Sequence, residues 1–298
     1  MKSRLFIYVA LGADSLIAIS KFIAAGVTGS SSMFSEGIHS VIDAVSQVLL
    51  ILGIKSSKRK PDGRRPFGYG KELYFWSFVV SLVIFVLGGC ISFYQGVLRT
   101  MQPDFKGSPN WSYAILSIAF VFNMISMVTV WKAFNKQRGT TSFIRAIKES
   151  KDPSTFISLL GDVADLIGLI IAFLGVYLGR LFHHPYYDGV ASMIIGIILI
   201  VISLFLARES KSLLMGETIS KTSRRKIITV AEADEAVVKV KELFSMFMGP
   251  EEILLEICAV FKNSLTTEEI TNAIERVSKT IRTKFPWVKH IYIEPRNK

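Results

Sequence analysis

Long uninterrupted apolar runs constrain this chain more than any other feature of its sequence. Half of its 298 residues are hydrophobic, and they are gathered into runs rather than spread evenly. About 20 residues at about 1.5 Å each cross the roughly 30 Å hydrocarbon layer of a membrane, so runs of this length predict membrane-spanning helices. About six such runs can be marked, at residues 6–27, 33–54, 73–98, 111–132, 156–181 and 189–207. The sequence therefore predicts an integral membrane protein with six transmembrane helices.

Basic residues are concentrated in the loops that follow the second and fourth runs, although the whole chain carries a net charge of +11. These loops hold Lys55, Lys58, Arg59, Lys60, Arg64, Arg65 and Lys71, and Lys136, Arg138, Arg145, Lys148 and Lys151. The alternating loops hold few basic residues. Because loops rich in Lys and Arg stay in the cytoplasm, six spans place both termini there, in a cell (inner) membrane. Orientation thus explains the positive charge, and no nucleic-acid partner is expected.

The sequence changes character after Ala207, which divides it into a membrane domain, residues 1–208, and a soluble tail, residues 209–298. EILLEICAVF alternates as a strand does, and Thr266 with Glu269 forms a capping box before a helical stripe. With a helix and a strand before them and a strand after, the order is α-β-β-α-β. This order predicts a small ferredoxin-like α+β domain. So small a domain has a limited core, and we expect it to form a homodimer.

The second apolar run contains three ionisable side chains where a lipid-facing helix should have none. Glu36, His39 and Asp43 stand within SEGIHSVIDAVSQ, spaced three and then four residues apart. This spacing puts them along one face of an α-helix. Since charged groups within a span face protein, water or a ligand, we interpret this face as a site.

A second polar face is predicted in the fifth run, within FISLLGDVADLIGLIIAF. Ser158, Asp162 and Asp165 lie four and then three residues apart. A carboxylate in a span costs at least a few kcal/mol unless it meets protein donors, water or a cation. Together the two faces would supply one imidazole nitrogen and several carboxylate oxygens, which suits a divalent cation. For either helix alone, a plain hydrogen bond between helices is the alternative.

These motifs resemble those of the cation diffusion facilitators, and the resemblance covers essentially the whole chain. That family carries His or Asp, three residues and then Asp in both the second and fifth spans. His39 and Asp43 in HSVID match this pattern, and Asp162 matches its second position, while Ser158 stands where His or Asp is usual. RRPFGYGKELYFW and PYYDGVASMIIGIILIVISLFLARESKSLLMGE are similar to the subgroup of the ninth human zinc transporter.

The resemblance implies a homodimeric antiporter, rather than an enzyme, that exports a divalent cation in exchange for protons and needs no prosthetic group. Its cargo is usually Zn²⁺ and sometimes Mn²⁺, Fe²⁺ or Co²⁺. The expected metal ligands are His39, Asp43, Asp162 and Asp165. Ser158 and Glu36 are auxiliary candidates, and for Glu36 we favour a structural role in which it pairs with Lys21 or Asn123. An oxygen-rich set favours harder ions such as Mn²⁺, Fe²⁺ or Mg²⁺, whereas the imidazole keeps Zn²⁺ among the candidates.

Two metal sites found in many family members are not expected here. Phe67 and Tyr69 stand where a loop site often has histidines, and His290 is the only histidine of the tail. Other classes fit less well. Intramembrane aspartyl proteases carry GxGD, but Leu159 occupies the first glycine position of LLGD. A tight multidentate site conducts poorly, which argues against a passive channel. A transporter of Mg²⁺ or another hard cation is the closer alternative.

Overall fold

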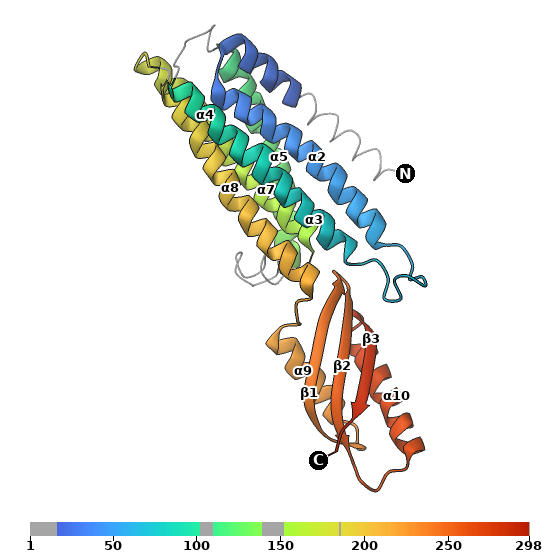
Figure 1. Ribbon diagram of the computed structural model, residues 1–298. Helices are drawn as coiled ribbons and strands as arrows, with labels where there is room; N and C mark the ends of the chain where they lie inside the picture. Colours follow the sequence, from blue (N-terminus) through green and yellow to red (C-terminus); the bar gives the residue numbers. More distant parts are fainter. Residues whose placement is uncertain (1–16, 102–109, 139–151, 185, 298) are drawn as a thin grey trace. The chain divides into compact units, whose positions relative to one another are not determined.

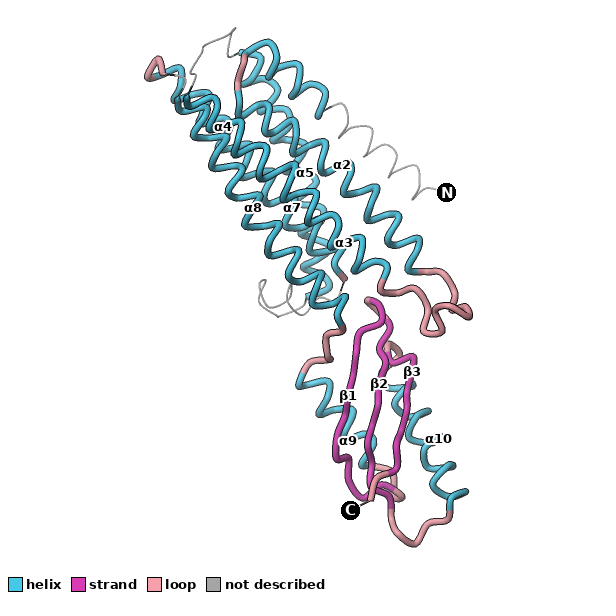
Figure 2. Tube along the Cα trace, in the orientation of Figure 1, coloured by secondary structure: helices cyan, strands magenta, loops and turns pink. Residues whose placement is uncertain are grey.

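The computed structural model describes residues 17–101, 110–138, 152–184 and 186–297. The chain divides into two compact units (Figure 1). One comprises residues 1–53 and 75–210, and the other comprises residues 54–74 and 211–298. The first is helical, and the second combines a sheet with helices (Figure 2).

The first unit is built from long apolar helices. After a helix at Ile17–Thr28 come α2 (Ser31–Ser57), α3 (Glu72–Val83), the π-helix η1 (Ile84–Cys90), α4 (Ile91–Met101), α5 (Asn110–Arg138), α7 (Pro153–Leu181) and α8 (Tyr186–Met215). The elements α3, η1 and α4 follow one another without a break, so together they form one long helix over Glu72–Met101.

Four helices among the described residues are long and apolar enough to cross a membrane. They are Ser31–Ser57, Glu72–Met101, Phe156–Leu181 and Tyr186–Met215. Shorter apolar helices, Ile17–Thr28 and Ser112–Val128, coincide with the first and fourth predicted spans. Residues 6–16 of the first predicted span lie outside the described residues. The prediction of a membrane helical domain is confirmed.

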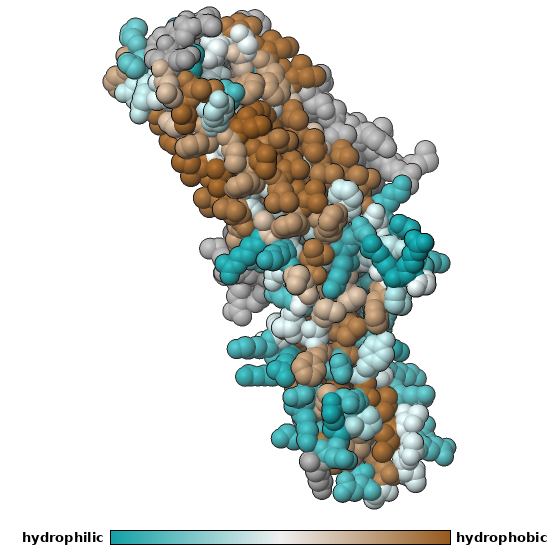
Figure 3. Space-filling model, in the orientation of Figure 1, coloured by the Kyte–Doolittle hydropathy of each residue, from teal (hydrophilic) through white to brown (hydrophobic). Residues whose placement is uncertain are grey.

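Figure 3 shows a broad apolar surface over the helices of the first unit. Ile23, Ile125 and Val201 are among the large apolar side chains that the helices of this unit expose. Soluble monomers rarely expose apolar patches of such extent, whereas lipid chains solvate them without cost. The outer face of these helices is therefore suited to hydrocarbon.

Glycines allow α4 and α8 to pack backbone against backbone. A Cβ added to Gly96 would lie 2.6 Å from the backbone nitrogen of Met193, and one added to Gly196 would lie 2.6 Å from that of Phe93. Small residues at such a contact let helices approach closely, as is common in membrane bundles. This close contact fixes the spacing between the two helices.

Asp188 of α8 anchors the first turn of α2. Its carboxylate accepts hydrogen bonds from the Ser30 hydroxyl (2.7 Å) and from the backbone N–H of Ser31 (2.6 Å). A carboxylate at a helix N-terminus satisfies N–H groups that have no partner within the helix. One turn further along, the Ser35 and Ser192 hydroxyls lie 2.6 Å apart. These polar contacts set the position of α2 relative to α8.

The second unit contains α9 (Lys221–Glu232), β1 (Val237–Gly249), β2 (Glu252–Phe261), α10 (Thr267–Lys284) and β3 (Val288–Pro295). The sheet order is β1-β2-β3, with β1 antiparallel and β3 parallel to β2. Leu255, Ile257 and Ile281 are completely buried between the sheet and α10. The predicted α-β-β-α-β order and the capping box of Thr266 and Glu269 are both confirmed.

The loop between α2 and α3 belongs to the second unit. The Phe67 ring meets the ring of His290 edge to face, with centroids 5.3 Å apart, and Lys71 Nζ lies 3.6 Å from the sulfur of Met246. The Tyr69 hydroxyl donates to Asp62 at 2.6 Å. Phe67 and Tyr69, which stand where histidines often occur in the resembled family, thus have packing roles in this chain.

Candidate metal centre

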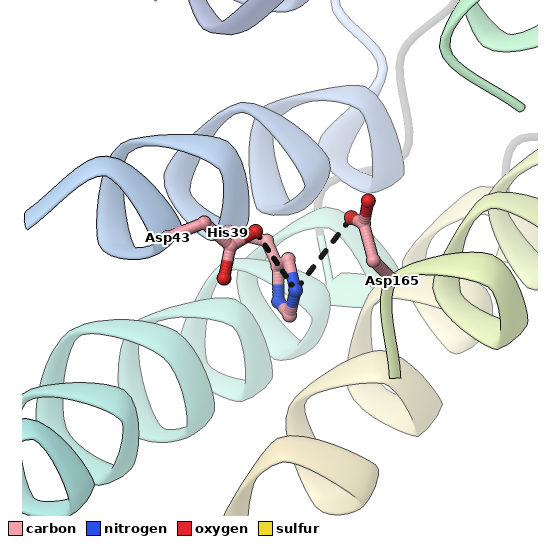
Figure 4. Close-up of side chains that lie close together, drawn as sticks. All are labelled: His39, Asp43 and Asp165. Carbon is pink, nitrogen blue, oxygen red and sulfur yellow. Dashed lines mark ion pairs between the residues drawn. The ribbon is translucent and has the colours of Figure 1, made fainter. Parts of the chain in front are cut away.

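The two polar faces predicted from the sequence lie on α2 and α7. Helix α2 carries Glu36, His39 and Asp43, and α7 carries Asp162 and Asp165. Both helices are long and regular through these positions, so the spacing in the sequence becomes alignment along a helix face. Figure 4 shows the imidazole of His39 between the carboxylates of Asp43 and Asp165.

Three side chains converge closely enough to hold one ion. His39 Nε2 lies 3.4 Å from Asp43 Oδ2 and 3.6 Å from Asp165 Oδ1 (Figure 4). One ligand atom from each residue lies within 4.8 Å of those of the other two. His39 and Asp165 are buried, and Asp43 is half-buried. An imidazole with two carboxylates is a donor set that Zn²⁺ and Mn²⁺ both accept.

Two of the converging atoms lack a hydrogen bond. Among the described residues, neither Nε2 of His39 nor Oδ1 of Asp165 has a hydrogen-bond partner, although both are buried. Buried polar atoms are nearly always bonded, because leaving one unsatisfied costs about 1–3 kcal/mol. A cation bound between them would satisfy both atoms, so the donor set fits a metal ion.

A network of buried polar side chains surrounds Asp165. Its other oxygen, Oδ2, accepts a hydrogen bond from the amide of Asn123 on α5. Lys21 Nζ lies 3.8 Å from Oδ1 and donates to Glu36 (3.1 Å) and to the Ser40 hydroxyl (2.8 Å). Three helices therefore contribute groups around the carboxylate that α7 supplies.

The remaining sequence candidates occupy different surroundings. Asp162 lies one turn before Asp165, half-buried, and is outside the set of three whose ligand atoms converge. Ser158 is exposed. Glu36 is almost completely buried and pairs with Lys21, which agrees with a structural role. Sequence reasoning did not single out Ser40, and its only indication was its place four residues after Glu36.

A second group of ligand-type residues lies in the sheet of the second unit. It contains Glu256, Cys258 and Glu294. Arg296 pairs with Glu294 at 2.9 Å and supplies the positive charge that a cation would otherwise bring. Burial raises the pKa of the Cys258 thiol, which disfavours the thiolate that binds metals. We therefore assign no ion to this group.

Comparison with known proteins decides the family. The profile of the cation efflux transmembrane domain matches residues 7–215. The chain belongs to the cation efflux family. This membership confirms the resemblance seen in the sequence and covers all the membrane helices described above.

Several curated proteins are similar over most of this chain. It is 32% identical over 245 residues to the Mus musculus proton-coupled zinc antiporter SLC30A9, mitochondrial, which covers 82% of this chain and 43% of the relative. Metal tolerance protein C4 of Arabidopsis thaliana is 29% identical over 256 residues, covering 83% and 55% respectively. The chain thus spans less than half the length of the SLC30A9 relatives it matches.

A bacterial relative matches nearly end to end. The manganese efflux system protein MneP of Bacillus subtilis is 22% identical over 291 residues, covering 98% of this chain and 95% of the relative. Among solved structures, a variant of the MamM C-terminal domain in its nickel form is 16% identical, with a TM-score of 0.25. It covers 26% of this chain and 99% of that chain.

Proposed function

We propose that this protein is a secondary transporter that exports a divalent cation in exchange for protons. The observation that carries the proposal is the buried convergence of His39, Asp43 and Asp165 between two apolar helices. Intramembrane ionisable groups are costly, and they mark ion pathways or proton relays when they gather in one place. The activities for which two relatives are named, proton-coupled zinc antiport and manganese efflux, support the same proposal.

Proton coupling would follow from competition for the same ligand atoms. A cation needs the lone pair of neutral His39 and the ionised carboxylates of Asp43 and Asp165. A proton on any of these groups removes a ligand, so proton binding expels the ion. If the site opens to one side of the membrane at a time, the side with higher proton activity receives the metal.

For the cargo, we propose Zn²⁺ first, with Mn²⁺, Fe²⁺ and Co²⁺ as alternatives. One imidazole favours Zn²⁺, while two carboxylates leave room for the harder ions. Asp162, one turn away on α7, is kept in the proposal as a fourth ligand that the ion could recruit. We further propose a homodimer in an inner membrane, with both termini in the cytoplasm.

Transport by purified protein in liposomes that enclose a pH dye tests this proposal. We expect Zn²⁺ or Mn²⁺ on one side to drive proton movement that His39→Ala and Asp165→Asn each reduce at least tenfold, since each variant removes one ligand. Glu251→Gln, an exposed change in the second unit, is the matched control and should keep the wild-type rate.

Two results would contradict the proposal. Metal-driven proton movement that survives in both site variants would show that His39 and Asp165 do not form the transport site. Large metal flux without any proton movement would replace the antiporter by a passive channel, because a channel has no counter-ion. A response to Mg²⁺ alone would change the cargo and leave the mechanism in place.

A further inference from the structure

Lys21 is a buried cation directly beside the candidate metal centre. It lies on the helix Ile17–Thr28, and its side chain is completely shielded from solvent. The metal chemistry assigned above does not use it. A buried ammonium is expensive unless it is paired, and it is rarely found in a span without a function.

The ammonium of Lys21 and the imidazole of His39 share one oxygen atom. Asp165 Oδ1 lies 3.8 Å from Lys21 Nζ and 3.6 Å from His39 Nε2. A cation that binds this oxygen must therefore approach a fixed positive charge. At such distances like charges repel strongly, because the low-dielectric interior screens them poorly.

Helix α2 holds the ammonium in this place. Lys21 Nζ donates to Glu36 Oε2 at 3.1 Å and to Ser40 Oγ at 2.8 Å, whereas its contact with Asp165 is longer than a hydrogen bond. Glu36 in turn lies against Gly168 of α7, where an added Cβ would collide with its carboxylate. The pair is thus positioned by contacts on both sides and has no need of Asp165 to satisfy it.

We propose that Lys21 is a built-in counter-cation that lowers the affinity of the transport site and so allows the ion to leave. With no metal bound, its charge offsets the carboxylate of Asp165, so that the empty site can change conformation without an uncompensated charge. With metal bound, Lys21 keeps its bonds to Glu36 and Ser40 and repels the ion. This inference rests on the proposed function, since it assumes that Asp165 is a metal ligand.

The role of Glu36 under this proposal is to hold Lys21 back from Asp165. Removing Glu36 lets the ammonium move closer to Asp165, which already lies 3.8 Å away, and compete with the metal for that carboxylate. Removing Lys21 leaves the metal with an unopposed acidic site. The two changes should therefore shift metal affinity in opposite directions. A pair that only joins two helices would respond the same way to either change.

Equilibrium binding of Zn²⁺ and Mn²⁺ to the purified full chain separates these cases. We expect the Kd to fall about tenfold or more in Lys21→Gln and to rise about tenfold in Glu36→Gln, from the change in nearby charge. Lys21→Gln with Glu36→Gln, which removes the charges of both members of the pair, should still bind more tightly than wild type, because no ammonium is left beside Asp165. Lys21→Arg should stay close to wild type. The exposed Lys55→Gln is the control for a general loss of positive charge.

Transport kinetics add a measurement that would stay unchanged if Lys21 only packed helices together. In Lys21→Gln the KM for metal should fall together with the maximal rate, because a tightly held ion leaves slowly. Shifts of Kd in the same direction for the two single variants, or a double variant that binds like wild type, would overturn the inference. If Lys21→Gln fails to fold, the double variant and Glu36→Gln still decide. The Asp165→Asn variant distinguishes failure of this inference from failure of the proposed function. If Asp165→Asn binds metal normally, the proposed site itself is wrong.

Discussion

Asp165 contacts polar side chains from three other helices. One of its oxygens faces His39 and Lys21, and the other accepts a hydrogen bond from Asn123. This second bond fixes the rotation of the carboxylate, so Oδ1 is held facing His39. Such positioning by neighbouring groups is how a metal centre acquires defined ligand geometry.

The ratio of oxygen to nitrogen ligands should set metal preference. Asp43→His would replace one carboxylate by a second imidazole, and imidazole favours Zn²⁺ over Mn²⁺. We expect the Zn²⁺/Mn²⁺ affinity ratio to rise roughly tenfold, which is about 1.4 kcal/mol. Competitive binding of the two ions to the purified chain measures it. An unchanged ratio would mean that Asp43 does not ligate the ion.

Most of these residues could be predicted from the sequence, but not which of them lie together around His39. Helical spacing placed Asp162 and Asp165 on one side of α7, because residues three apart lie within a narrow arc of a helix. Which of the two meets His39 depends on how α7 is rotated about its own axis, and that is set by packing against α2 and α5. Lys21 was visible as a charge in a span, but its nearness to Asp165 depends on contacts far apart in the sequence.

At the scale of elements, the N-terminus of α2 depends on a side chain from α8. Asp188→Ala would remove the acceptor for the Ser31 N–H and for the Ser30 hydroxyl. Losing a cap and leaving buried donors unsatisfied should lower the free energy of unfolding by about 2 kcal/mol. Thermal unfolding in detergent measures this loss, and Glu209→Ala, on the same helix, is the control. Equal stability of the two variants would show that the cap contributes nothing.

The ion pair between Asp234 and Arg276 should make the second unit sensitive to acid. Burial raises the pKa of Asp234, but hydrogen bonds from Arg276 and from the Ala236 N–H outweigh it and hold the pKa below its ordinary value. An acid with a lowered pKa stabilises the fold above the unfolded pKa, near 4, and loses this contribution as pH falls through the folded value.

We therefore expect the protection of α10 amides against hydrogen exchange, relative to the intrinsic rate at each pH, to fall below about pH 4 in wild type, in step with protonation of Asp234. Arg276→Ala should exchange faster at neutral pH and show a smaller change on acidification, because the pair is already absent. Identical acid profiles in the two proteins would exclude the pair as the cause. Arg282→Ala, also exposed on α10, controls for loss of a surface charge.

Local patterns predicted the elements of the second unit well. The alternation of β2 and the capping box of α10 depend on residues close together in the sequence, and both are present. The π-helical segment Ile84–Cys90 was not predicted, since its composition does not differ from that of an α-helical span. The association of Phe67 with His290 was also beyond sequence reasoning, because more than two hundred residues separate the two rings.

For the whole molecule, the distribution of basic residues predicts orientation. If the loop after α2 is cytoplasmic, a cysteine at Lys58 should react with an impermeant thiol reagent only in inside-out vesicles. A cysteine at His183, in the exposed turn before α8, should react only in right-side-out vesicles. Both cysteines go into a background without Cys90 and Cys258. Labelling of both from the same side would contradict the six-span topology.

Binding of a divalent cation between α2 and α7 is tested most directly by crystals of the full chain grown with Mn²⁺ or Zn²⁺, through the anomalous signal of the metal. We predict a peak within about 2.3 Å of His39 Nε2 and of carboxylate oxygens from Asp43 and Asp165, and its loss in Asp165→Asn. A peak elsewhere in the membrane domain, or one unaffected by Asp165→Asn, would contradict the account.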